Sequence, residues 1–195
     1  EILADSHDGS MWASGPWNET RSINFSWNIY DLDYNFFLNT REEESNLAWI
    51  YRVSLPFDTS DIPDHSNIMF ATLKLFISEQ EFSNSHPDLF DYLTLVRTSL
   101  GSPPMLSITD FGAFGSLNNP LEGAQRLDIS QLNSHFDELS FNLNSNGLSW
   151  IDSQGWTTVG IRGGFDIEDY YPPAEDFRFG FATVSAKSQI FGPKL

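Results

Sequence analysis

The chain has 195 residues, of which 40% are hydrophobic and 15% aromatic, enough apolar material for one packed domain and too much for a disordered tract. Ten Lys and Arg residues oppose 27 Asp and Glu residues, and the formal net charge of −17 disfavours nucleic acid and anionic membrane surfaces as partners. Cysteine is absent, which excludes disulfides and thiol chemistry, and no apolar run approaches the roughly 18 residues of a membrane span.

In the first half of the chain, apolar and polar residues alternate with a period of two, the pattern of half-buried strands. Residues 23–30 are the first predicted strand, with Trp27 on its core face, and residues 34–39 are its expected hairpin partner. Residues 47–55 form the next strand, which we expect to end at Pro56 because proline cannot donate to a ladder. A turn-rich connection then leads to a strand whose core face is predicted to carry Met69, Ala71, Leu73, Leu75 and Ile77.

The second half continues with short strands, predicted at residues 92–98, 126–129, 139–143, 156–162, 177–183 and 189–195. Residues 107–114 are expected to form a helical turn capped by Thr109 or Asp110, and residues 147–152 a short helix after the turn dipeptide Asn146-Gly147. About ten short strands predict an all-β fold, an antiparallel β-sandwich of jelly-roll type, as a single domain over residues 1–195. The chain starts without an initiator Met, so we expect a processed product or part of a longer protein.

Two stretches resemble a known family. Residues 51–60 (YRVSLPFDTS), followed by Ile62-Pro63 and by residues 71–75 (ATLKL), resemble a stretch of DNRLRE-type domains, which are disaggregatase-related and similar to carbohydrate-binding modules. Residues 141–148 and 155–162, with Asp166, resemble the C-terminal half of the same family. The resemblance implies a jelly-roll domain of microbial surface and secreted proteins, some of whose relatives bind carbohydrate.

The resemblance is incomplete at its end. The family usually closes with a P-x-L-x-V-x-Y strand, whereas this sequence stops at Pro193-Lys194-Leu195. We expect the missing piece to be cleaved, disordered or supplied by a neighbour. No binding residue transfers from the family, because the matched positions are those of core, turn and strand-end residues.

Motifs of catalysis are missing from the sequence: it contains no H-E-x-x-H, G-x-S-x-G, Walker or G-x-G-x-x-G pattern. The four histidines each stand beside Ser or Asp in loop-like sequence. Carboxylates are abundant enough to supply a glycosidase pair, but their abundance also makes any pair uninformative. We therefore expect that the protein is not an enzyme, with a glycan-active enzyme as a third alternative.

Calcium is the most specific cofactor that the sequence suggests, in a structural role. Residues 31–35 place oxygen ligands at the first odd positions of an EF-hand-like loop, but Phe36 stands where that loop requires Gly, and a plain hairpin turn explains the segment equally. Other acidic groups lie in predicted loops near the two ends of the chain. The candidate ligands are Asp5, Asp8, Asp31, Asp33, Asn35, Asp166, Glu168 and Asp169.

Aromatic residues in polar surroundings suggest carbohydrate binding, because sugars stack on flat aromatic faces. Trp12 and Trp17, in Gly-, Ser- and Pro-containing sequence, are the expected exposed pair, whereas Trp27, Trp49 and Trp156 fit core positions. The candidate glycan-binding residues are Trp12, Trp17, Tyr30, Tyr34, Tyr170 and Tyr171. Asn18 and Asn24 begin N-glycosylation sequons, which suit a surface protein and also arise by chance.

These patterns favour a non-catalytic extracellular module, secreted or on a cell surface, with a virion surface as a further possibility. The first hypothesis is a structural building block of a filament, sheath or fibre, whose partners are copies of itself or neighbouring modules joined at sheet edges. The alternative is a carbohydrate-binding or adhesion module for a polysaccharide.

Overall fold

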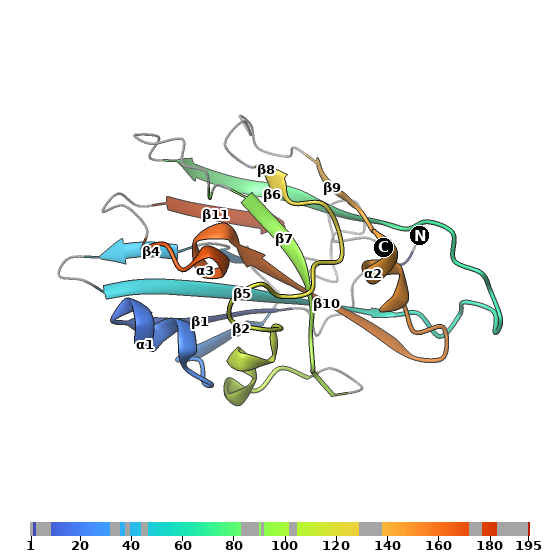
Figure 1. Cartoon of the computed structure of the whole chain (residues 1–195), viewed down its shortest axis with the longest axis horizontal. Helices are drawn as coiled ribbons and strands as arrows, with labels where there is room; N and C mark the ends of the chain where they lie inside the picture. The colour runs from blue at the N-terminus through green and yellow to red at the C-terminus, as the bar shows by residue number, and fades with distance from the viewer. Residues whose placement is uncertain are drawn as a thin grey trace.

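The computed structural model describes residues 2, 9–31, 36–37, 40–43, 47–82, 90, 92–101, 105–128, 138–171, 177–182 and 195. Antiparallel β-sheet accounts for most of the regular structure, as predicted (Figure 1). The larger sheet has the order β2-β1-β5-β10-β7-β8, with β4 paired to β5 off this path, and the smaller sheet has the order β3-β11-β6-β9.

The larger sheet contains β1 (Gly9–Gly15), β2 (Asn28–Asp31), β4 (Thr40–Glu43), β5 (Leu47–Asp58), β7 (Tyr92–Arg97), β8 (Leu127–Asp128) and β10 (Trp156–Gly163). The smaller sheet contains β3 (Phe36–Phe37), β6 (Thr72–Phe82), β9 (Glu138–Asn142) and β11 (Phe177–Ala182). The short helices are α1 (Trp17–Ser22), α2 (Ser145–Ser149), α3 (Gly164–Glu168) and the 3₁₀ helix η1 (Ile108–Ala113).

Strand β5 is buried on both faces, because each face of the larger sheet is covered. Val53, Leu55 and Phe57 point to one side and belong to a core cluster shared with the smaller sheet. Ile50 and Arg52 point to the other side, beneath a cover of helices and loops. The period-two alternation of this strand thus separates two cores rather than a core from solvent.

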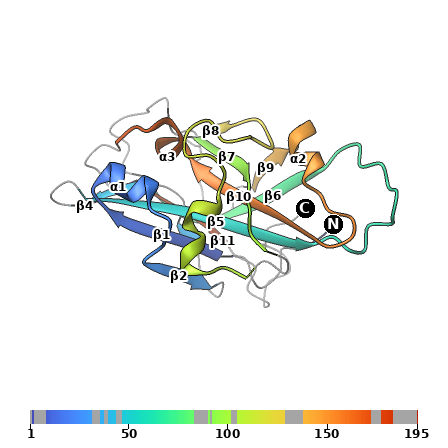
Figure 2. The same ribbon diagram turned by 60° about the horizontal axis from the view of Figure 1, so that its bottom comes forward.

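The two cores are distinct. The first lies between the sheets and includes residues of β5, β6, β7, β9 and β10, namely Val53, Leu55, Phe57, Leu73, Leu75, Leu93, Leu95, Leu139, Phe141, Val159 and Ile161. The second lies on the opposite face of the larger sheet, where α1, η1 and α3 gather (Figures 1 and 2). Its members are Met11, Ala13, Trp17, Ala48, Ile50, Val96, Phe111, Phe114 and Phe165.

The predicted strand over residues 23–30 is wrong in its extent, and so is the core position of Trp27. Only its last residues belong to β2, which pairs with β1, and Trp27 is 59% exposed. Strand β1 was missed because most of its residues are small, and small residues are buried without an apolar pattern. Helix α1 follows Pro16, whose carbonyl accepts the first helical hydrogen bond from Thr20.

Contrary to the prediction, Pro56 does not end its strand. It lies inside β5, opposite Thr158. Among the described strands, β1 pairs with β5 only as far as Ser54, so that Pro56 has a neighbouring strand on one side alone. Proline is tolerated at such an edge position. Strand β6 likewise differs from the prediction: it starts later, at Thr72, and continues through Phe82.

Several local predictions are confirmed. The helical turn near residue 108 is η1, although its cap is Ser107, which forms a reciprocal capping box with Asp110. Helix α2 lies close to its predicted position, but Asn146 and Gly147 are inside it and Asn144 caps it. The strand predicted at residues 189–195 falls outside the described residues except for Leu195, which forms two backbone hydrogen bonds with Ile2.

Candidate functional site

Two arginines face the helix-covered side of the larger sheet at the same level. Arg52 belongs to β5 and Arg162 to β10, and these strands pair so that Ile161 lies opposite Val53. The next residues along each strand, Arg162 and Arg52, therefore face the same side close together. Both side chains are almost fully buried, and two adjacent like charges are unfavourable unless an anion lies between them.

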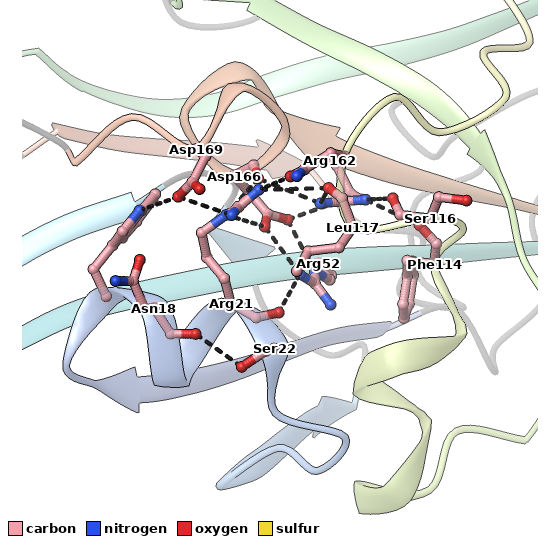
Figure 3. Close-up of polar contacts among 12 residues, drawn as sticks. Asn18, Arg21, Ser22, Arg52, Phe114, Ser116, Leu117, Arg162, Asp166 and Asp169 are labelled. Carbon is pink, nitrogen blue, oxygen red and sulfur yellow. Dashed lines mark hydrogen bonds and ion pairs between the residues drawn. The ribbon is translucent and has the colours of Figure 1, made fainter.

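Asp166 supplies that anion. It belongs to α3, which follows β10 directly, so that the chain folds back over the arginine four residues earlier. Its Oδ2 accepts from Nε of Arg162 at 2.7 Å and from Nε of Arg52 at 2.9 Å, and its Oδ1 accepts from Nη2 of Arg52 at 2.9 Å (Figure 3). The carboxylate is 1% exposed.

Arg21 of α1 is the third buried arginine of this cluster. Its Nε and Nη2 donate to the carbonyl oxygen of Asp166 at 2.8 and 2.6 Å, and its Nη1 pairs with Asp169 at 2.8 Å. Asp169 also accepts from Nε1 of Trp17. We call Arg21, Arg52, Arg162 and Asp166 the buried arginine cluster.

Backbone carbonyls satisfy the remaining guanidinium donors. Arg52 donates to the Phe111 carbonyl at 2.7 Å, and Arg162 donates to the Ser116 and Leu117 carbonyls at 2.7 and 3.0 Å (Figure 3). The cluster thereby fixes the cover formed by η1 and the turn after it onto the sheet. Its members stabilise the fold and, being buried, are closed to a soluble ligand.

The electrostatics agree with a structural role. Burial raises the pKa of Asp166, but Arg52 and Arg162 outweigh that effect and the net result is a pKa well below its usual range. Burial lowers the pKa of Arg52, and Asp166 opposes this change. Asp166 therefore stays ionised at neutral pH.

The acidic group predicted to bind calcium at residues 166–169 has other partners. Asp166 and Asp169 pair with arginines, and Glu168 accepts hydrogen bonds from Tyr92 and Arg126. Those contacts hold the pKa of Glu168 below its usual range, chiefly through the Tyr92 hydroxyl. In the described part of the chain no three acidic or histidine side chains converge in a metal-binding group. Asp5, Asp8, Asp33, Asn35 and the side chain of Asp31 lie outside the described residues.

The predicted exposed pair of tryptophans is not exposed as a pair. Trp17 is 9% exposed within the second core. Trp12 is half-buried and stacks on Trp49, with ring centroids 4.3 Å apart and planes 13° apart. Tyr170 is 44% exposed, and Tyr171 is partly buried against Trp17. Tyr34 and the side chain of Tyr30 lie outside the described residues, and both sequon residues, Asn18 and Asn24, are exposed.

An open groove lies at the end of β7, around Arg97. Strand β8 pairs with β7 only at Tyr92 and Leu93, so the segment that continues past Arg97 runs free of that strand. Two adjoining hollows of about 400 and 600 Å³ share Arg97, Thr98 and Leu100. We call the two hollows together the Arg97 groove.

The smaller hollow combines aromatic and polar side chains. Its other lining residues are Gly101, Ser149, Trp150, Ile151, Asp152, Trp156 and Thr158. Helix α2 places Trp150 there, and its ring packs so closely on Gly123 that a Cβ at residue 123 would collide with it. Trp156 is half-buried at the start of β10, which gives the groove an accessible indole.

The groove contains one cation without an acidic partner. Among the described lysine and arginine side chains, Arg97 is the one without such a partner. A ligand that brings oxygen acceptors and a flat apolar face matches this guanidinium and the indole of Trp156.

Sequence patterns do not reveal this groove, because its walls are about 50 residues apart in the chain. Trp156 fits a core position in the sequence, and no local pattern singles out Arg97. The buried arginine cluster does have a signal in the sequence. An arginine in the middle of an otherwise apolar strand, as at Arg52, implies a buried anionic partner.

The sequence matches no family model, and no curated protein matches it at a significant level. In the described part of the chain, no helix is both long and apolar enough to cross a membrane.

Proposed function

We propose that this chain is a non-catalytic jelly-roll β-sandwich module that binds a polysaccharide through the Arg97 groove. The observation that carries the proposal is the combination, in one groove, of the accessible indole of Trp156 with the unpaired guanidinium of Arg97. Such a module acts outside the cell, where the acidic composition suits it.

The jelly-roll assignment is supported by the connections between strands. From β5 to β11 the chain changes sheet at every step except between β7 and β8. In a jelly roll, consecutive strands alternate between two packed sheets in this way. The core cluster shared by the sheets supplies the packing that a sandwich needs.

The groove has the chemistry of sugar recognition. The apolar face of a pyranose stacks on an indole, and its hydroxyls accept from Arg97 and exchange hydrogen bonds with the Thr98 and Thr158 hydroxyls. A guanidinium also pairs with carboxylate, so a sugar acid has an additional attraction.

The same lining supports binding without catalysis. Asp152 is the one carboxylate among the residues that line the groove, and its Oδ1 accepts from the backbone of Gln154. Glycoside hydrolysis ordinarily requires two carboxylates that flank the scissile bond. A binding role needs no such pair.

The test is isothermal titration calorimetry against a panel of soluble polysaccharides, neutral and carboxylated. We expect binding to at least one of them, weakened about tenfold or more in Trp156→Ala and in Arg97→Ala, since a charge-assisted hydrogen bond contributes about 1.5–3 kcal/mol. If Arg97 contacts a carboxylate, Arg97→Ala weakens carboxylated ligands more than neutral ones.

The matched control is Trp27→Ala, which removes a tryptophan that is 59% exposed and does not line the groove. It should leave binding unchanged. Absence of binding across the panel contradicts the proposal, and so does a loss of binding in the control as large as in Trp156→Ala.

A second function, a structural unit of an extracellular assembly, is favoured by a separate observation. Met69 and Phe70 are 73% and 85% exposed, side by side, on a projecting loop. Apolar side chains presented in this way are typical of protein contacts.

A further inference from the structure

The loop over residues 59–71 is an ordered projection. It connects β5 to β6 and extends from one end of the molecule (Figures 1 and 2). At its base the hydroxyl of Thr59 hydrogen-bonds to the Asp152 and Gly155 carbonyls and to Thr157. Internal turns follow, with Ile62 donating to Thr59 and Ser66 to Pro63. The loop is therefore presented in a defined conformation, at little further entropic cost.

The loop presents two apolar side chains close to the start of β6 and acidic side chains before them. Met69 and Phe70 are the two most exposed large apolar side chains among the described residues. Between Arg52 and Lys74 the sequence contains Asp58, Asp61 and Asp64 but no lysine or arginine. Asp61 and Asp64 are exposed, and neither takes part in an ion pair.

The Arg97 groove has the complementary properties. Leu100, Ile151 and Trp156 offer it apolar surface, and Arg97 is a cation without a partner. In a chain with a net charge of −17, most surfaces of two copies repel each other. An unpaired cation beside Leu100, Ile151 and Trp156 is therefore the place at which an acidic loop with exposed apolar side chains, from a second copy, is attracted.

The positions of loop and groove allow a closed pair. The loop, helix α2 and the start of β10 all lie toward the same end of the molecule in both ribbon views (Figures 1 and 2). A two-fold axis at that end brings each loop to the groove of the other copy. In such a contact each copy contributes both its loop and its groove, so the association stops at a dimer.

We propose that two copies of this chain associate through a two-fold contact in which the residue 59–71 loop of each copy occupies the Arg97 groove of the other. Phe70 packs on the Trp156 side of the groove, and Arg97 pairs with Asp61 or Asp64. The association covers the groove and so competes with any polysaccharide for it. The dimer does not depend on whether the groove also binds a sugar.

The experiment is sedimentation equilibrium of the protein over a range of concentrations. The expected species has twice the chain mass. The double variant Met69→Ser, Phe70→Ser should raise the dissociation constant at least about tenfold, because burying one phenylalanine side chain contributes about 1.5–3 kcal/mol. Arg97→Asp should weaken the dimer, and Arg97→Asp combined with Asp61→Arg and Asp64→Arg should restore it.

The matched control is Phe25→Ser with Trp27→Ser, which removes two exposed aromatic residues remote in sequence from the loop and from the groove lining. Its mass should equal that of the wild type, and circular dichroism should be the same for all variants, whose changes are at exposed positions. A monomeric wild type overturns the proposal. So does a polymer larger than a dimer, failure of the charge exchange to restore association, or equal loss in the control.

The two proposals fail separately. The Met69→Ser, Phe70→Ser variant keeps every residue of the groove, so it should bind polysaccharide at least as tightly as the wild type does. If it is monomeric and binds no polysaccharide, the sugar-binding proposal fails and the dimer stands. If the wild type is monomeric and binds polysaccharide, the dimer fails alone.

Discussion

Arg162 and Arg97 lie in the same ladder, on the paired strands β10 and β7, yet their surroundings are opposite. Arg97 is opposite Val159 and Arg162 is opposite Thr94, only a few residues away along the two strands. Arg162 is 1% exposed and donates to Asp166 and to three backbone carbonyls besides that of Asp166. Arg97 is exposed and has no acidic partner in the described part of the chain.

The difference shows what makes an arginine structural. The cover formed by η1 and the following turn supplies oxygen atoms to every guanidinium of the buried arginine cluster, and α3 supplies the carboxylate. Arg97 lies on the opposite face of the sheet, the face of Val159, at the end of β7, and no described carboxylate pairs with it there. Burial and acceptor supply, rather than residue type, separate the two roles.

The largest expected effect is at Asp166. Asp166→Ala leaves the buried guanidinium groups of Arg52 and Arg162 without their anion, and breaking a buried ion pair in this way costs about 3–5 kcal/mol. We expect a loss of that size in the free energy of unfolding, measured by urea denaturation. A loss below about 1 kcal/mol would show that the cluster relaxes or admits water.

A matched pair of substitutions compares the two arginines directly. Arg162→Lys keeps the charge but cannot reach Asp166, Ser116 and Leu117 together, so at least one buried acceptor loses its donor and stability falls by about 1–3 kcal/mol. Arg97→Lys should change stability by less than about 0.5 kcal/mol, as exposed substitutions do. Equal effects at the two positions, in urea denaturation, would contradict the distinction.

The smallest effect is a dependence on pH. Because the pKa of Asp166 is lower in the folded protein than its unfolded value of about 3.9, the ionised carboxylate stabilises the fold fully above that value. This stabilisation is lost as the pH falls from about 4 through the folded pKa. Carboxyl carbon chemical shifts should show Asp166 still ionised at pH 3, where exposed aspartates are largely protonated. An Asp166 titration near pH 4 would contradict the assignment.

The sequence predicts those elements whose pattern is local. The strand pattern of β5, β7, β9 and β10 lies in consecutive residues, and the capping residues of the 3₁₀ helix are adjacent to it in the sequence. Strand β1 and helix α1 were not predicted, because small buried residues and a short amphipathic turn leave no clear period in the sequence. The alternation wrongly placed Trp27 in the core, whereas its indole lies on the surface and donates a hydrogen bond to the Ser14 carbonyl.

The candidate site was less predictable than the fold, for a geometric reason. Arg97, Trp150 and Trp156 converge only after β7 and β10 have paired and α2 has docked on Gly123. The aromatic residues near the start of the chain were predicted to bind glycan because they are clustered in sequence, but Trp17 is buried in the second core. Exposure depends on packing partners that a single sequence does not specify.

The contacts of the buried arginine cluster are also distant in sequence, and this bears on the order of folding. Its hydrogen bonds join residues 145 and 114 positions apart, from Arg21 and Arg52 to Asp166, and 46 positions apart, from Arg162 to Ser116. Arg52 and Arg162 meet only once β5 and β10 have paired, so we expect these bonds to form after that slow, long-range pairing. Interactions absent from the transition state slow unfolding without slowing folding. We therefore expect the cluster to slow unfolding and so to set how long the folded protein survives. The rate of unfolding in denaturant measures this effect.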